Sequence, residues 1–433
     1  MRERLFARAL VLEQNGRKLC IVAPDLAMIA APWSRRIRQA IHERCGIAYD
    51  DVMVSFPQIH SAPAIGNFIL DDELPNVPPE HDYLRGSQQV FNEWATGRLI
   101  EAAVQANANL VPVEMAVGRA VRDDLAFNRR GVRRDGIVTM PWFYKKENQP
   151  LGPTDILYIE GPMDPEVGLM AFKDESGRFV AALLHHTCHP VNVYATAKHD
   201  ISSDWPGTWA AGVESLLGES CVAMVLNGCC GNINPWPAFT PDLMPDHQRM
   251  GRELTRTVET LLPTLTFNSP SILEGVSRSI PLPIRDVSPA DRAWAEKMLK
   301  DYPQPLWKKE NPKEVEWEWM QAAMLMSLEL ERARSPNYDC GIQVFRVGST
   351  AIIGLPGEPF VEGQLAIKQA SPAEMTFVVH LTNDSAGYIP PVAAYARGGL
   401  EIGTKPSMIH RVAPGGLECL VEETRKTLKE MFP

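Results

Sequence analysis

Three features that assign a protein to a broad class are missing from this sequence. Its eight cysteines include no CxxC pair, so neither a zinc knuckle nor a disulfide-stapled scaffold is indicated. No apolar run reaches the roughly 18 residues that a membrane span needs, and we expect no transmembrane helix. The formal net charge is -10 and no stripe of lysine and arginine with interleaved aromatics stands out, so nucleic acid is not an expected partner.

A secretory leader is missing too. The charged segment at residues 1–8 passes directly into an apolar segment at 9–13, which is not the pattern of a signal peptide. Taken at face value, the sequence indicates a cytoplasmic protein whose cysteines are mostly reduced thiols in the core.

What is present is the composition of an ordinary globular protein. Of its 433 residues, 45% are hydrophobic and 22% are charged, which is enough apolar material for one large core or several smaller ones. Strand-like apolar runs alternate with helical periods along the chain. We therefore predict an α/β fold with mixed β-sheets flanked by helices. From about residue 286 to 336 the composition turns to Glu, Lys, Trp, Met and Ala, which predicts a helical insertion.

Residues 185–207 place histidines at the end of an expected strand. Four of the ten histidines, at positions 185, 186, 189 and 199, follow the apolar run 179–184. Neutral imidazole is the commonest metal ligand, and a rigid strand end positions a ligand well. The alternative interpretation is that these are surface or core histidines satisfied by hydrogen bonds.

Two other expected strands end in metal-capable side chains. The run 51–56 leads to His60, which is followed by small residues and a proline, and the run 350–355 leads to Glu358. Side chains of different strands meet where the strands end at one edge of a fold. We therefore predict a metal site at clustered strand ends.

Two further segments suggest substrate contacts. The polar loop that contains residues 129–134 holds four arginines within six residues. Guanidinium forks suit a carboxylate or phosphate on a substrate, and the alternative is a solvated loop whose arginines form salt bridges. The run 221–226 leads into Asn227-Gly228-Cys229-Cys230, where small residues allow a ligand to approach the backbone. The adjacent cysteines raise a nucleophile hypothesis, although no local feature indicates a stabilised thiolate.

Six segments, taken together and in order, resemble the neutral/alkaline non-lysosomal ceramidase family. They are His60-Ser61-Ala62-Pro63, Asn128-Arg129, His189-Pro190 followed by Ile201-Ser202-Ser203-Asp204, residues 227–235, Leu355-Pro356-Gly357-Glu358, and residues 383–388. The resemblance runs from about residue 5 to about residue 410. It implies that residues 1–433 form a single catalytic domain that carries the helical insertion.

The resemblance implies a zinc amidase whose metal is held by two histidines, a glutamate and a tyrosine. Carried over by position, the metal ligands are His60, His189, Glu358 and Tyr388. Such nitrogen and oxygen donors can hold Zn²⁺ and leave room for a water, whose pKa the metal lowers. Candidates for orienting ligands or transferring protons are His199, Asp204 and Asn227. Candidates for contacting the substrate are Asn128, Arg129, Gly228 and Cys229.

Three departures from the family pattern narrow the expected chemistry. The family has two histidines where this chain has Gln58 and His60, so the first ligand position is open between the two. Gly228 stands where ceramidases place a serine, and Asn232 replaces an acidic residue. The carboxy-terminal immunoglobulin-like domain of ceramidases has no counterpart here, so we expect a substrate other than ceramide.

Family members share a strand upstream of the position of Met1, and a truncated start would make a secreted or periplasmic location the alternative.

The leading prediction is a zinc-dependent hydrolase of an amide or related bond in a small polar or anionic molecule, acting through a metal-activated water. Two alternatives stay open. One is a hydrolase that uses Cys229 as its nucleophile. The other is a catalytically degenerate small-molecule-binding protein, motivated by Gly228 and Gln58.

Overall fold

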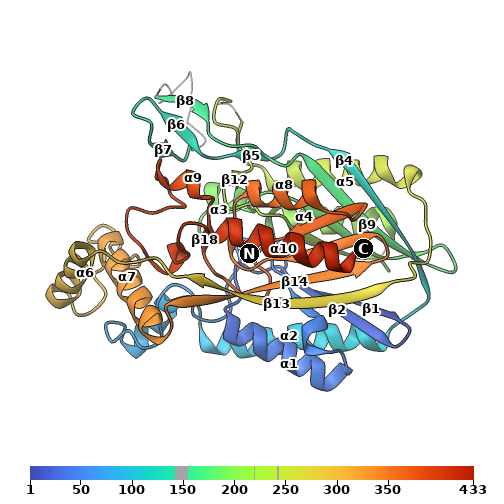
Figure 1. Ribbon diagram of the computed structural model, residues 1–433, viewed down its shortest axis with the longest axis horizontal. Coiled ribbons are helices and arrows are strands. Elements are labelled where there is room, and N and C mark those ends of the chain that lie inside the picture. The colour runs from blue at the N-terminus through green and yellow to red at the C-terminus, as the bar shows by residue number, and fades with distance from the viewer. Residues whose placement is uncertain (142–154, 219, 241–242) are drawn as a thin grey trace.

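The computed structural model describes residues 1–141, 155–218, 220–240 and 243–433. Three larger β-sheets pack against one another in this part of the chain, and helices cover their outer faces (Figure 1). Parallel and antiparallel strand pairs occur within the same sheet. The prediction of an α/β fold with mixed sheets is therefore confirmed.

The first sheet has the strand order β1-β2-β3. Its strands are β1 (Ala7–Gln14), β2 (Arg17–Pro24) and β3 (Val52–Val54). The hairpin of β1 and β2 is antiparallel, as the Asn-Gly turn between them favours, and β3 joins β2 in parallel. Helices α1 (Ala31–Cys45) and α2 (Gln89–Ala108) lie along this sheet, blue to cyan in Figure 1. Helix α1 ends at Gly46, whose φ of 66° is the left-handed conformation that glycine adopts freely.

The second sheet has the order β11-β10-β9-β4. Its strands are β4 (Val113–Val121), β9 (Glu166–Asp174), β10 (Phe179–His186) and β11 (Val222–Asn227). Helix α4 (Asp204–Leu217) is the crossover that brings β11 parallel to β10, and it packs with α5 (His247–Leu261) on the sheet. Strand β10 runs two residues further than the apolar run predicted, so His185 and His186 are strand residues buried in the core.

The third sheet has the order β13-β14-β15-β17. Its strands are β13 (Leu273–Pro283), β14 (Asn337–Val347), β15 (Thr350–Gly354) and β17 (Met375–Val379). Helix α8 (Val361–Ala370) is the crossover between the parallel strands β15 and β17. Helix α10 (Gly416–Met431) packs beside α8, and both lie across this sheet in Figure 1.

Two helices lie between β13 and β14, in the part of the chain where a helical insertion was predicted. They are α6 (Pro289–Asp301) and α7 (Trp317–Arg334), and they project from the body of the molecule at the left of Figure 1. Ser288 begins α6 by accepting a hydrogen bond from the backbone N–H of Asp291, which is the contact that a serine makes at the start of a helix. Trp319 on α7 is fully buried, so this tryptophan packs in the core and does not face solvent.

Short ribbons and turns connect these layers. They are β5 (Phe127–Asn128) paired with β12 (Ile233–Asn234), β16 (Glu358–Pro359) paired with β18 (Tyr388–Ile389), the ribbon of β6 (Gly131–Arg133), β7 (Val138–Thr139) and β8 (Ile156–Ile159), and the short helices α3 (Asn192–Thr196) and α9 (Val392–Tyr395).

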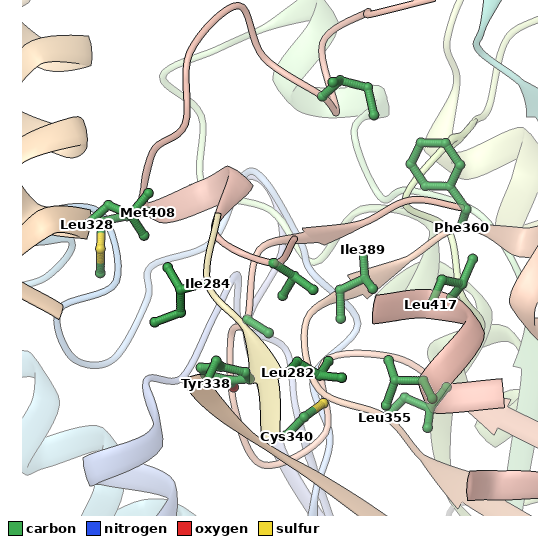
Figure 2. Packing of buried hydrophobic residues seen from close by; sticks show 14 of the residues in the cluster. Leu282, Ile284, Leu328, Tyr338, Cys340, Leu355, Phe360, Ile389, Met408 and Leu417 are labelled. Atoms are coloured by element: carbon green, nitrogen blue, oxygen red, sulfur yellow. The ribbon is translucent and has the colours of Figure 1, made fainter. Parts of the chain in front are cut away.

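Buried apolar side chains fill the space between the layers. One cluster lies between α7, α8, α10 and the third sheet, and Leu282, Tyr338 and Leu417 are among its labelled side chains in Figure 2. A second joins side chains of all three sheets, among them Ile21, Leu183 and Phe377. Burial of this apolar area is the main force that fixes the sheets relative to one another. No described helix is long and apolar enough to span a membrane.

Candidate functional site

Several strands of the three sheets end close together, and their backbones are joined there. The N–H of His380 donates to the carbonyl of Asn227 over 3.1 Å, so the ends of β17 and β11 are in contact. The N–H of Asn383 donates to the carbonyl of Val54 over 2.7 Å, which ties the segment after β17 to the end of β3. The N–H of His60 donates to the carbonyl of Pro190 over 3.1 Å. The segments that carry the predicted metal ligands therefore converge.

His189 and Glu358 face each other within this convergence. Their atoms Nε2 and Oε2 are 3.4 Å apart, and both side chains are buried. The His189 Nδ1–H donates to the carbonyl of Ile233 over 3.0 Å, which leaves Nε2 as the nitrogen with the lone pair. Burial, and then the positive charge of Arg129, lowers the pKa of His189 to about 3, so the imidazole is neutral near pH 7. Among the described residues, neither Nε2 nor Oε2 has a hydrogen-bond partner.

This pair of atoms tests whether a cation suits the site. A neutral imidazole lone pair and a carboxylate oxygen are both acceptors, and two acceptors that face each other in a buried place repel unless a proton or a metal ion lies between them. The Ile233 carbonyl fixes the other ring nitrogen of His189. Metal-binding histidines are usually oriented by a hydrogen bond of this kind. The donor set fits a metal. Within the described residues, however, no three His, Cys, Asp or Glu side chains already stand in a metal-binding group.

Tyr388 lies beside Glu358 because the two residues are register partners in the parallel pair β16 and β18. Burial raises the pKa of its phenol, and the charge of Glu358 acts in the same direction. The Arg129 guanidinium opposes this effect, since its Nη2 donates to the Tyr388 hydroxyl over 3.2 Å. A phenol, a carboxylate and an imidazole are thus brought together as the resemblance predicted, and their roles as ligands remain predictions.

Arg129 is held by a network of buried partners. Its Nε donates to Glu401 over 2.7 Å, its Nη1 donates to Asn234 over 3.2 Å, and its Nη2 also donates to the carbonyl of Gly231 over 2.7 Å. Glu401 in turn accepts from Arg130 over 2.8 Å. Burial alone would raise the pKa of Glu401, but the two guanidinium groups lower it below its ordinary value. Arg129 therefore sits beside the predicted ligands with most of its donors engaged by protein groups.

His60 lies on the open side of the site. Its ring is exposed to solvent and its centroid is 5.6 Å from that of His189 and 5.5 Å from that of Tyr194 on α3. Desolvation by the protein around it, and then repulsion from His189, lowers its pKa to about 3. His60 is therefore the most accessible of the predicted metal ligands.

His380 is a residue that the sequence reasoning missed. It follows β17 directly, is fully buried, and lies with its Nδ1 3.7 Å and its Nε2 3.9 Å from the Cys230 sulfur. Burial, and then His189, lowers its pKa to about 3, while the charge of Glu358 opposes the shift. The signal that could have found it is the same as for His60: an apolar strand that ends in a histidine.

Asp204 and Asn227 hold backbone in place. The carboxylate of Asp204 accepts from the Asn192 side chain over 2.9 Å and from the backbone N–H of Val193 over 2.8 Å. The amide of Asn227 donates to the carbonyls of Pro57 and Cys188 over 2.9 and 3.0 Å. These contacts fix the segments that bear the predicted ligands, which suits an orienting role. His199 is exposed in a turn after α3, so the structure does not place it among the buried side chains of the site.

The predicted substrate contacts have structural partners as well. The Asn128 side chain donates to the carbonyl of Pro162 over 2.8 Å and accepts from the Arg130 N–H over 3.0 Å. A Cβ on Gly228 would lie 2.0 Å from the Thr187 hydroxyl and 2.6 Å from the Gln364 side-chain oxygen. A side chain at the position that is serine in ceramidases would therefore require Thr187 and Gln364 to move.

Cys229 is fully buried next to this glycine. Its backbone N–H donates to the Gln364 side chain over 2.7 Å. Burial raises the pKa of its thiol, and the charge of Asp164 raises it further. This environment stabilises the thiol and not the thiolate that a nucleophile needs.

Comparison with solved structures finds the same architecture. One similar structure is the neutral ceramidase of Pseudomonas aeruginosa, and another is a ceramidase complexed with C2. Each match has a TM-score of 0.68 and 18% sequence identity, and it covers 99% of this chain and 70% of the ceramidase chain. No protein-family model matches the sequence. No curated protein matches it either. The chain therefore has the neutral-ceramidase fold, as the resemblance of its segments predicted.

Proposed function

We propose that this protein is a zinc-dependent hydrolase that cleaves an amide or related bond in a small molecule. The observation that carries the proposal is the buried pair of His189 Nε2 and Glu358 Oε2, which are 3.4 Å apart and have no hydrogen-bond partner in the part of the chain that the structure describes. A divalent cation satisfies both acceptors at once. The fold that the chain shares with ceramidases supports the same chemistry.

His189, Glu358 and Tyr388 would hold the metal. The neutral state of His189 suits this role, because only an unprotonated imidazole can bind a metal. The ring nitrogens of His60 and His380 are the two candidates for the remaining metal-ligand position. Bound zinc supplies Lewis acidity, which lowers the pKa of a water and polarises a carbonyl group.

The residues around the site would position the substrate and exclude water. Arg129 holds the Tyr388 hydroxyl at 3.2 Å, and the described contacts leave one of its five N–H groups for an oxygen that gains negative charge. Asn227 and Asp204 fix the backbone of the ligand-bearing segments. His60 is exposed and can contact a bound molecule.

The substrate is proposed to be small and polar or anionic. Gly228 leaves no side chain to contact a ligand, where ceramidases place a serine. Arg133 is exposed on β6, paired with Asp135 over 2.8 Å, and exposed arginines of this loop suit a carboxylate or phosphate. A panel of amides and esters with and without an anionic group would identify the class.

Metal analysis with paired variants tests the proposal. We expect His189→Ala and Glu358→Gln to lose both bound zinc and hydrolysis, and a chelator to remove the activity of the unaltered protein. His42→Ala is the matched control, because this histidine lies on α1, where its ring nitrogen Nδ1 is 2.7 Å from the Ile47 carbonyl. Full zinc occupancy in both site variants would overturn the proposal.

A binding protein without catalysis is the second candidate, favoured by Gly228 and Gln58. Both depart from the family pattern, and the tight packing at Gly228 shows that the serine could not return without movement of Thr187. Absence of metal on elemental analysis, together with no hydrolysis across the amide and ester panel, would favour this candidate over the zinc hydrolase.

A further inference from the structure

Gln58 occupies the position where the family pattern places a histidine, and it does so inside the protein. The residue is 2% exposed and has a φ of 69°, which few non-glycine residues adopt. Its side-chain oxygen is 3.9 Å from the Cys230 sulfur. An amide is a poor ligand for zinc compared with imidazole or thiolate, so this corner of the site has lost a nitrogen donor.

A buried imidazole lies next to the same sulfur. His380 approaches Cys230 from the end of β17, with its two ring nitrogens 3.7 and 3.9 Å away. Gln58 and His380 are thus neighbours across one thiol, although 322 positions separate them in the sequence. The contacts with sulfur are long and weak, because a thiol is a poor hydrogen-bond partner.

Cys230 also adjoins the predicted ligands. Its carbonyl accepts from the N–H of Ile233, whose own carbonyl fixes His189. The next residue, Gly231, lies so close to Glu358 that a Cβ would approach the Glu358 carbonyl oxygen to 2.5 Å. His380 therefore stands on a continuous path of contacts to both His189 and Glu358, all of it buried.

We propose that His380 supplies the second metal-binding nitrogen in place of the histidine that Gln58 replaces. The inference rests on the proposed zinc site. It restores a donor set of two imidazoles, a carboxylate and a phenol, drawn from His189, His380, Glu358 and Tyr388. His60, which is exposed and has Tyr194 on one side, then lines the wall that faces the substrate.

X-ray absorption at the zinc edge of the unaltered protein tests the inference directly, because it counts imidazole and sulfur ligands. We expect two imidazoles and no sulfur. The same two imidazoles should remain in His60→Ala, whose side chain is exposed and whose loss should not disturb folding. Loss of one imidazole in His60→Ala would overturn the inference, and so would a sulfur ligand that disappears in Cys230→Ser.

Zinc affinity measured by competition with a chromophoric chelator gives a second readout. We expect His380→Ala and His380→Gln to bind zinc more than about 100-fold more weakly, as the loss of a ligand requires. His60→Ala should bind zinc within about 3-fold of the unaltered protein, since it loses no ligand. Circular dichroism establishes that each variant is folded; if the His380 variants are not, the ligand count in His60→Ala decides.

The outcomes also separate this inference from the proposed function. If the unaltered protein binds no zinc, or if His189→Ala and Glu358→Gln both keep it, both fail. If zinc is bound through His189 and Glu358 but His380→Gln retains full affinity, the proposed function stands and the role of His380 is wrong.

Discussion

The guanidinium of Arg129 donates to the hydroxyl of Tyr388 over 3.2 Å and lies 5.6 Å from the centroid of its ring. The same guanidinium is paired with Glu401 over 2.7 Å. One carboxylate therefore sets the position of the arginine, and the arginine sets the position of the phenol. Replacement of Glu401 should therefore change the position of Tyr388 indirectly, through Arg129.

Glu401→Gln should lower the free energy of unfolding by about 3 kcal/mol, because it leaves the buried charges of Arg129 and Arg130 without their shared partner. Urea unfolding followed by tryptophan fluorescence measures the change. Glu93→Gln is the matched control: this glutamate pairs with Arg36 over 2.7 Å on the surface, and no measurable loss is expected there. Equal stability of the two variants would show that the Arg129 network does not depend on Glu401.

A side chain at position 228 should lower the stability of the protein. Gly228→Ala brings a methyl group against the Thr187 hydroxyl and the Gln364 oxygen, and overpacking of this kind costs about 1–3 kcal/mol. Adding Thr187→Ala should recover part of the loss in thermal unfolding, since it removes the closer of the two atoms. Gly97→Ala on α2 is the control, because a Cβ there meets nothing within 4 Å and alanine favours a helix. A tolerated Gly228→Ala would contradict the packing.

The sequence predicts features that depend on residues close together in the chain better than features that depend on distant contacts. The hairpin of β1 and β2, the end of α1 at Gly46 and the start of α6 at Ser288 all follow from local rules that act on neighbouring residues. Neighbouring polar residues at strand ends also indicated that His189 and Glu358 would meet. Local rules state where a strand ends but not which strands end side by side.

The residues that the sequence did not reveal owe their positions to distant contacts. His380 has the strand-end signal of His60, yet only the contact between the ends of β17 and β11 brings it next to Cys230. Glu401 lies 272 positions from Arg129, and no periodicity joins the two. Conversely, His185 and His186 carry the metal-ligand pattern but extend β10 by two residues, which turns their rings into the core.

The cysteines offer a test of the rival with a thiol nucleophile. Within the described residues Cys419 is exposed and Cys229 and Cys230 are fully buried, and burial raises the pKa of both buried thiols. Iodoacetamide on the folded protein should therefore label Cys419 and leave hydrolysis unchanged, because alkylation requires an accessible thiolate. Peptide mass spectrometry locates the label, and Cys419→Ser should abolish it. Inactivation that follows labelling of Cys229 would support the nucleophile hypothesis instead.

Stability at acidic pH should depend on His186. Burial, and then repulsion from His185, lowers its pKa from 6.5 to about 4, with Asp164 opposing the shift and Arg122 adding to it. Below pH 6.5 the unfolded chain therefore takes up a proton that the native protein refuses until about pH 4, so the native state loses stability as the pH falls through this window.

The loss from this single group should reach about 3 kcal/mol near pH 4 and be absent above pH 7, as a shift of this size requires. His186→Leu keeps a buried apolar side chain of similar volume against Trp205, whose ring lies 5.7 Å from the imidazole. Urea unfolding of both proteins from pH 4 to 8 gives the difference, which isolates His186 because the other buried histidines titrate in each. The two curves should run parallel above pH 7 and separate below 6.5, with the variant the more stable at pH 4. Curves that stay parallel down to pH 4 would mean that the native protein accepts a proton on His186 as readily as the unfolded chain does.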